Sequence, residues 1–140
     1  MEDIMEEKVL IRAAMEARQR AYAHYSDFMV GAALLTENGK VYQGCNIENA
    51  SYGATNCAER TAVFRAVSEG ELRFHAIAIV GGMRDRELTY AYPCGICRQV
   101  LREFCDPEQM QVIVAKSETD YKKFTLAELL PESFGPDFAD

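Results

Sequence analysis

The sequence lacks any long hydrophobic run. Its longest uncharged apolar stretch, Phe28 to Thr36, is far shorter than the ~20 residues that a membrane-spanning helix needs. The chain also opens on acidic residues such as Glu2 and Asp3, whereas a secretory signal needs a basic start followed by an apolar segment. We therefore expect no membrane partner and a cytoplasmic location.

Basic residues are scarce as well. The chain has 15 Lys and Arg against 22 Asp and Glu, which gives a net charge of −7. Because affinity for nucleic acid depends on Lys and Arg displacing counterions from phosphates, this balance disfavours a nucleic-acid polymer as a partner. With 49% hydrophobic residues and no repeat, linker or low-complexity segment, residues 1–140 are predicted to form a single domain.

Histidine is almost absent, and the cysteines do not pair evenly. The two histidines, His24 and His75, lie far from the cysteine motifs in sequence. The number of cysteines is odd, and in a reducing cytosol cysteines more often bind metal or do chemistry than form bridges. The spacing of the five therefore becomes the main question; they stand at positions 45, 57, 94, 97 and 105.

Apolar periodicity predicts the secondary structure. Three main helices are expected over residues 4–22, over 57–69 after an N-cap at Asn56, and from Pro93 onward. Strands are expected over 28–35, 41–47, 75–80 and 111–115, followed by a fifth strand over 121–125 and a short helix over 126–130. Asn38-Gly39 predicts a type I′ turn between the first two strands.

The order of these elements indicates the fold class. Helices alternate with strands, and the strands over 75–80 and 111–115 are too hydrophobic to leave one face in water. An α/β fold is therefore predicted, as a three-layer α-β-α sandwich with a central mixed sheet.

Three cysteines stand at the starts of two predicted helices. Cys57 opens the second helix, and Cys94 and Cys97 open the third. The positive end of a helix dipole favours thiolates, which are the form that binds metal. Three thiolates on Zn²⁺ leave a fourth position for water, which is typical of a catalytic site. We predict one zinc ion per chain.

Charged residues beside Cys57 add to this prediction. Glu59 could reach the water, whose pKa a metal lowers from ~15.7 toward neutrality, and could carry its proton elsewhere. The combination indicates hydrolysis. Three thiolates and Zn²⁺ sum to −3 + 2 = −1, so the guanidinium of Arg60 is predicted to compensate this charge. The alternative interpretation is that Arg60 is a surface arginine without a role at the metal.

Each motif also has a simpler interpretation. Asn56-x-x-Glu59 fits a variant capping box, in which Glu59 only satisfies the N-cap amide. Cys94-x-x-Cys97 resembles a redox dithiol, but a redox site would give no role to Cys57 or Glu59. A noncatalytic zinc module would need a fourth protein ligand and no Glu59. The conjunction therefore favours metal catalysis.

The sequence closely resembles the small homotetrameric cytidine deaminases that bind zinc through three cysteines. The resemblance spans nearly the whole chain. Its motifs are Ala21-Tyr22, Tyr25-Ser26-Asp27-Phe28, Val30-Gly31-Ala32-Ala33, Gly44-Cys45-Asn46-Ile47-Glu48-Asn49-Ala50-Ser51-Tyr52, Cys57-Ala58-Glu59-Arg60-Thr61, Cys94-Gly95-Ile96-Cys97-Arg98-Gln99 and Leu129-Leu130-Pro131.

This resemblance implies hydrolytic deamination of cytidine and 2′-deoxycytidine to uridine and 2′-deoxyuridine, with release of ammonia. It also implies a homotetramer with shared active sites. A deaminase of a cytosine nucleoside antibiotic is the alternative. The implied site comprises the zinc ligands Cys57, Cys94 and Cys97, the proton shuttle Glu59, the ribose partners Asn46 and Glu48, Phe28 in the base pocket, the amide of Ala58 on the pyrimidine O2, and Ala50, Tyr52 and Phe134 reaching a neighbouring subunit.

Two of these expectations rest on weak local signals. From the residues alone, Asn46 and Glu48 could equally serve turn chemistry after the second strand. The C-terminal tail, residues 131–140, could be disordered. The resemblance instead places that tail against a neighbouring subunit.

Overall fold

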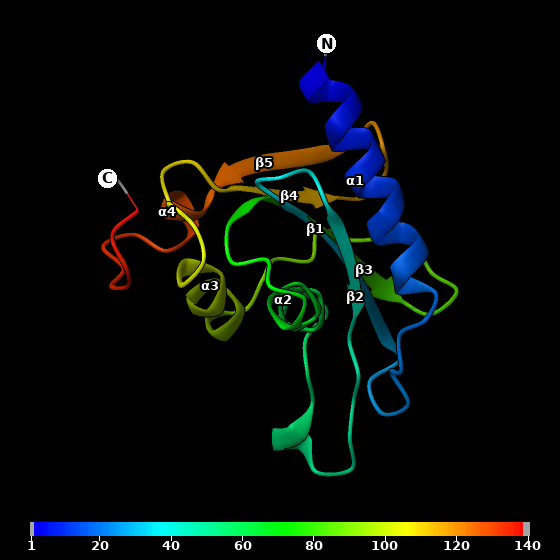
Figure 1. Ribbon diagram of the computed structural model, residues 1–140. Helices are drawn as coiled ribbons and strands as arrows, with labels where there is room; N and C mark the ends of the chain where they lie inside the picture. Colours follow the sequence, from blue (N-terminus) through cyan, green and yellow to red (C-terminus); the bar gives the residue numbers. More distant parts are fainter. Residues whose placement is uncertain (1, 139–140) are drawn as a thin grey trace.

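The structure is a computed structural model that describes residues 2–138. It confirms the predicted α/β class (Figure 1). The elements are α1 (Glu2–Arg18), β1 (Phe28–Thr36), β2 (Val41–Cys45), the 3₁₀ turn η1 (Tyr52–Ala54), α2 (Ala58–Ser68), β3 (Phe74–Met83), α3 (Gly95–Arg102), β4 (Gln111–Ala115), β5 (Tyr121–Thr125) and α4 (Leu126–Leu129).

The five strands form one mixed sheet in the order β2-β1-β3-β4-β5. Only β3 and β4 run parallel, and the other three pairs are antiparallel. The connection between the parallel strands contains α3, because parallel neighbours need a crossover rather than a tight turn. This crossover brings the second cysteine motif back to the sheet.

Both faces of the sheet are apolar, as the sequence predicts. Along β3, Ile77 and Ile79 belong to the core beneath α2 and α3, whereas Ala76, Ala78 and Val80 belong to the core beneath α1. Figure 1 shows α1 on one side of the sheet and the other helices on the opposite side. The three-layer sandwich is therefore confirmed.

The β1–β2 turn differs from the prediction. A type I′ turn needs a positive φ at both central residues, but Gly39 has φ of 90° while Asn38 is not in the left-handed region. The amide of Gly39 donates to the carbonyl of Thr36 at 3.1 Å, and the amide of Thr36 donates to the carbonyl of Lys40 at 2.9 Å. This is the three-residue hairpin loop, in which glycine alone takes the left-handed position.

The first helix ends four residues earlier than predicted, at Arg18. Beyond it, the amides of Gln19, Arg20 and Ala21 each bond to the carbonyl three residues back, so the helix tightens into a 3₁₀-like turn. The guanidinium of Arg18 donates to the carbonyls of Met29 and Gly82, both at 2.9 Å. The helix end is thus set by contacts with β1 and β3, which periodicity does not reveal.

None of the helices within residues 2–138 is both long and apolar enough to cross a bilayer.

Gly31 on β1 gives a test of how closely α1 packs. A Cβ at this position would lie 2.0 Å from the carbonyl oxygen of Ala14 and 2.5 Å from the amide nitrogen of Arg18. Both are backbone atoms of α1, so the helix must shift to admit a methyl group. We expect Gly31→Ala to lower the free energy of unfolding by about 2 to 3 kcal/mol, measured by urea denaturation.

Gly53→Ala is the matched control, because nothing lies within 4 Å of its added Cβ. It should stay within about 0.5 kcal/mol of the unchanged protein. Equal stabilities for the two variants would contradict the close helix–sheet contact.

Candidate active site

Two helix N-termini bring three cysteines together. Cys57 is the N-cap of α2 and Cys94 is the N-cap of α3, and Cys97 lies in the first turn of α3. The Sγ atoms of Cys57 and Cys94 are 3.8 Å apart, and those of Cys94 and Cys97 are 3.5 Å apart. Among the described residues, these three form the one group of potential ligands placed to hold a metal ion.

The sulfur spacing fits zinc. Four ligands arranged tetrahedrally at the Zn–S distance of about 2.3 Å lie about 3.8 Å from one another. All three sulfurs lie within 4.8 Å of one another, and none is in a disulfide, whose bond is only about 2.05 Å long. Three ligands leave one tetrahedral position open, so the arrangement suits a catalytic metal rather than a closed structural one.

Arg60 lies against the first of these sulfurs. Its Nη2 donates to the Sγ of Cys57 at 3.2 Å, and its Nε is buried without a hydrogen-bond partner. A hydrogen bond from Cys97, together with this guanidinium, lowers the pKa of the Cys57 thiol to about 5. The cluster therefore favours at least one thiolate even before a dication is added, and Arg60 is not a freely solvated surface residue.

Glu59 is buried at the base of the cluster, with 4% of its surface exposed. Burial raises the pKa of its carboxyl to about 7, and the neighbouring Cys57 sulfur acts in the same direction. A carboxyl with its pKa near neutrality can both accept and release a proton at physiological pH. Such a group is suited to proton transfer rather than to a permanent ion pair.

The simpler interpretation of Glu59 as a helix cap is wrong. The N-cap of α2 is Cys57 rather than the predicted Asn56, so Glu59 is the second helical residue and not the third. The side chain of Asn56 instead donates to the hydroxyl of Thr61 at 3.1 Å. A redox dithiol is also disfavoured, because Cys57 lies as near to Cys94 as a shared ligand site requires.

A cavity of about 360 Å³ opens beside the cluster. Glu59, Cys57 and Cys94 line it together with Phe28 and Asn46. Apolar and polar residues complete the wall, a combination typical of small-molecule sites. The lining residues are Phe28, Val30, Asn46, Thr55, Asn56, Cys57, Ala58, Glu59, Ile79, Ala91, Tyr92 and Cys94.

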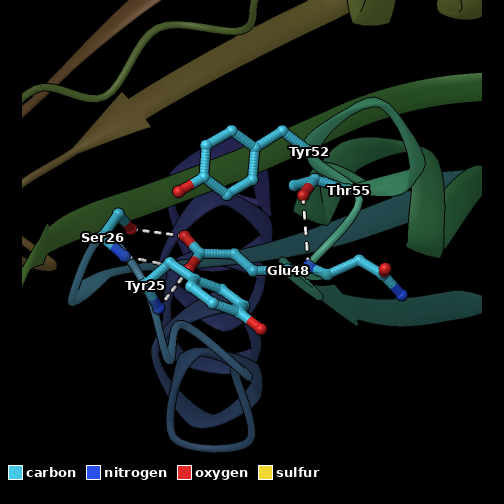
Figure 2. Close-up of a pocket in the computed structure, with 6 residues that line it drawn as sticks. Tyr25, Ser26, Glu48, Tyr52 and Thr55 are labelled. Carbon is cyan, nitrogen blue, oxygen red and sulfur yellow. Dashed lines mark hydrogen bonds between the residues drawn. The ribbon is translucent and has the colours of Figure 1, made fainter.

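A second cavity, of about 430 Å³, shares Thr55 with the first. Tyr25, Ser26, Glu48 and Tyr52 gather around it (Figure 2). Hydrogen bonds from Ser26 and from the backbone of Tyr25 outweigh the opposing effect of burial, so the pKa of the Glu48 carboxyl lies below its usual value. A carboxylate therefore stands at the end of the site away from the cysteines.

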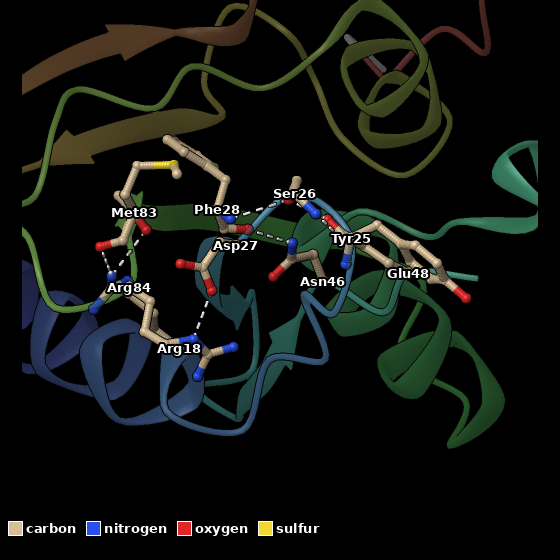
Figure 3. Close-up of polar contacts among 10 residues, drawn as sticks. Arg18, Tyr25, Ser26, Asp27, Phe28, Asn46, Glu48, Met83 and Arg84 are labelled. Atoms are coloured by element: carbon tan, nitrogen blue, oxygen red, sulfur yellow. Dashed lines mark hydrogen bonds and ion pairs between the residues drawn. The ribbon is translucent and has the colours of Figure 1, made fainter. Parts of the chain in front are cut away.

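Asn46 and Phe28 line the first cavity, and the backbone amide of Phe28 donates at 3.0 Å to the hydroxyl of Ser26, which lines the second (Figure 3). The Oδ1 of Asn46 accepts the Val30 amide at 2.9 Å, and its Nδ2 donates to the Phe28 carbonyl at 2.8 Å. The Asn46 side chain thus continues the pairing with β1 just after β2 ends, and the residue also lines the first cavity. The turn-chemistry alternative is partly correct, because Asn46 and Glu48 both hold backbone in place.

The three residues expected at a neighbouring subunit are differently placed. Tyr52 lines the second cavity, whereas Ala50 and Phe134 are among the lining residues of neither cavity of this chain. Ala50 is exposed, and Phe134 is 82% exposed. Sequence reasoning assigned no role to Ser26 or Thr55, because the side-chain contacts that bring them to the site are with Glu48 and Asn49, 22 and six positions away.

Zinc content gives a direct test of the cysteine cluster. Purified protein should contain about one zinc per chain, and Cys97→Ala should lose most of it, because two thiolates hold the ion far less tightly than three. Elemental analysis measures both. Cys45→Ala is the control, since this half-buried cysteine lies outside the cluster. Full zinc retention in Cys97→Ala would contradict the proposed ligand set.

Comparison with known proteins identifies the family. The family model of the cytidine and deoxycytidylate deaminase zinc-binding region matches residues 5–115. A cytidine deaminase of Sporosarcina psychrophila is 49% identical over 130 residues, which cover 93% of this chain and 92% of the relative. A cytidine deaminase of Mycobacterium tuberculosis is 41% identical over 124 residues, which cover 89% of this chain and 86% of the relative.

Solved structures agree. The 1.6 Å crystal structure of cytidine deaminase from Burkholderia pseudomallei has a TM-score of 0.81 at 48% identity, covering 90% of this chain and 97% of that one. The crystal structure of cytidine deaminase from Mycobacterium tuberculosis has a TM-score of 0.76 at 38% identity, covering 91% of this chain and 96% of that one. This chain therefore belongs to the cytidine and deoxycytidylate deaminase family, whose members are zinc-dependent hydrolases.

Proposed function

We propose that the protein deaminates free cytidine and 2′-deoxycytidine to uridine and 2′-deoxyuridine. Water is consumed and ammonia is released. The observation that carries this proposal is a buried glutamate beside three convergent thiolates, at the wall of a cavity that ends in polar groups. The relatives named as cytidine deaminases support the same reaction.

In this proposal, Cys57, Cys94 and Cys97 hold the zinc ion. When bound, zinc supplies a Lewis acid that makes water nucleophilic at neutral pH. Arg60 brings the summed charge of thiolates, dication and guanidinium to −3 + 2 + 1 = 0, so the pull of the metal is not cancelled by its own ligands.

Glu59 moves the protons. Its carboxylate takes one proton from the attacking water and delivers it to N3 of the pyrimidine, as oxygen adds to C4. The same carboxylate then takes the remaining proton from the hydroxyl on C4 and passes it to the 4-amino group, so that the C4 carbonyl forms as the C4–N4 bond breaks and ammonia leaves. Burial suits Glu59 to this role, because it raises the pKa of the carboxyl to about 7. Near that pKa the carboxyl can both accept and release a proton at neutral pH.

The remaining lining residues orient the nucleoside. Phe28 lies against the base, and the amide of Ala58 donates to the pyrimidine O2. At the sugar hydroxyls, the Asn46 amide donates or accepts and the Glu48 carboxylate accepts. Ala58 suits its role because the first amides of a helix have no partner within the helix.

The charges of the site favour nucleosides over nucleotides. Apart from the cysteines, Glu48 and Glu59 are the charged residues among those lining the two cavities. Phosphate recognition depends on Arg, Lys or clustered amides, and a carboxylate at the sugar end repels it. We therefore assign free nucleosides rather than deoxycytidylate as the substrate.

The tail is proposed to complete the site of a neighbouring subunit in a homotetramer. Gln99 donates to the carbonyl of Phe134 at 3.1 Å, and Arg102 donates to the Ser133 hydroxyl at 3.0 Å and to the Pro136 carbonyl at 2.6 Å. These bonds fasten the described part of the tail to α3 while the Phe134 ring faces outward; residues 139 and 140 lie outside the described part. An exposed ring on an anchored segment suits a second copy of this chain.

Glu59→Gln tests the reaction. We expect the variant to keep its zinc and its fold but to lose at least about 10³-fold in kcat, since an amide cannot shuttle protons. The fall in cytidine absorbance on conversion to uridine measures turnover, with CMP and dCMP as comparison substrates. Glu69→Gln, at the other end of α2, is the control. Near-normal turnover by Glu59→Gln would refute the proton-transfer role.

Phe134→Ala tests the shared site. We expect a rise of about tenfold in KM for cytidine with zinc content unchanged, because the ring no longer covers a partner's substrate. Phe138→Ala is the matched control, since that tail ring packs instead under the Arg73 guanidinium, 4.4 Å from its centroid.

Mixed oligomers then decide whether the ring acts across subunits. Coassembly of Phe134→Ala chains with Glu59→Gln chains should restore a low KM at the sites where the intact ring meets the intact glutamate. A fully active monomer in light scattering would refute the shared site.

A further inference from the structure

The carboxylate of Glu48 is held entirely by the turn that precedes β1. Its Oε1 accepts the backbone amides of Tyr25 at 2.9 Å and Ser26 at 3.0 Å. Its Oε2 accepts the hydroxyl of Ser26. Ser26 therefore supplies two of the three hydrogen bonds on this carboxylate, one from its backbone and one from its side chain (Figures 2 and 3).

The direction of the Ser26 hydroxyl is fixed from its other side. Its Oγ accepts the backbone amide of Phe28 at 3.0 Å. A serine hydroxyl has only one hydrogen to donate, and the Phe28 amide occupies one of its two lone pairs. The one hydroxyl hydrogen of Ser26 therefore points to Oε2 of Glu48. A single hydroxyl thus links the backbone of a base-pocket residue to the carboxylate at the sugar end.

The turn itself does not depend on a ligand. Asp27 takes a left-handed conformation with φ of 63°, and its amide donates to the Ala23 carbonyl at 3.0 Å. Arg84, which follows β3, donates its amide to the Asp27 carbonyl at 2.9 Å and its Nε to the Asp27 carboxylate at 2.6 Å. Ser26 is therefore presented by a turn that the sheet holds in place.

We propose that Ser26 is a positioning residue that aims the Glu48 carboxylate at a sugar hydroxyl of the substrate. This inference rests on the proposed function, in which Glu48 contacts the sugar. A carboxylate has about four acceptor sites, and three are occupied by the turn, which leaves one for a hydroxyl of the ligand. Without the serine hydroxyl, Oε2 loses the one hydrogen bond that it has among the described residues, and the carboxylate, held only at Oε1 by two backbone amides, can rotate away from the sugar.

Kinetics on three variants test the proposal. Ser26→Ala should raise KM for cytidine about tenfold and change kcat less than about twofold, because the reacting end of the site is untouched. Ser26→Thr keeps a hydroxyl and should stay within about threefold of the unchanged protein. Ser117→Ala is the matched control, since the Ser117 hydroxyl likewise accepts the amide two residues ahead, at 3.2 Å, but touches no carboxylate.

A substrate without the hydroxyls separates positioning from structure. For 2′,3′-dideoxycytidine, Ser26→Ala should leave KM within about twofold of the unchanged protein, because there is no ring hydroxyl for Glu48 to meet. A general loosening of the turn would instead raise KM for both substrates alike. That result, or an unchanged KM for cytidine, would overturn the positioning role.

A double-mutant cycle shows whether Ser26 acts through Glu48. Once Glu48→Ala is present, adding Ser26→Ala should have little further effect on kcat/KM. Independent, multiplying effects would overturn the proposal, because they would mean that Ser26 acts without Glu48.

These experiments also separate failure of the Ser26 proposal from failure of the proposed deaminase function. If the unchanged protein does not deaminate cytidine, both fall. If Glu48→Ala raises KM while Ser26→Ala does not, the sugar contact stands and the positioning role alone is overturned.

Discussion

Negative charge gathered between two helix N-termini is the constraint on which the rest of this structure depends. Three thiols that must lose their protons to bind a metal stand beside a buried carboxyl. Bare, such a group of charges would be unstable. The free amides at the starts of α2 and α3, the guanidinium of Arg60 and a divalent ion together offset it. A bound dication would therefore help to balance the charge of the thiolates and the carboxylate.

The sheet determines that the two helix starts meet. A Cβ at Gly44 on β2 would lie 2.4 Å from both the Ala58 carbonyl and the Ala62 amide, so α2 rests directly on the strand. Buried alanines along α2 allow this approach. The crossover through α3 then returns to the same face, where Leu101 is fully buried. Because both helices pack closely on the same face of the sheet, their N-terminal cysteines meet, with sulfur atoms within 4.8 Å of one another.

Much of this was predictable from the sequence, and the failures share a cause. Periodicity located every α-helix and strand, and β4 and β5 match their predicted bounds. The end of α1, the N-cap of α2 and the β1–β2 turn were wrong, because each depends on a distant partner or on one dihedral angle. The clustering of Cys57, Cys94 and Cys97 was predicted correctly, since helix starts and cysteine spacing are local signals. Ser26 was missed because its partner, Glu48, lies 22 residues away.

The polar groups assigned to the sugar also maintain the fold, and this bears on how the site can bind. Asn46 is 9% exposed and uses one acceptor and one donor of its side chain on the edge of β1. An amide offers two of each, so one donor and one acceptor remain for a ligand. Glu48 likewise has most of its acceptor sites occupied, because the turn before β1 holds its carboxylate and Arg84, which follows β3, holds that turn. Groups fixed in this way lose little further freedom when a nucleoside binds, because their ordering was already achieved when the chain folded. The same arrangement makes the site sensitive to its supports: a change in the turn before β1 alters the sugar end without touching the cysteines.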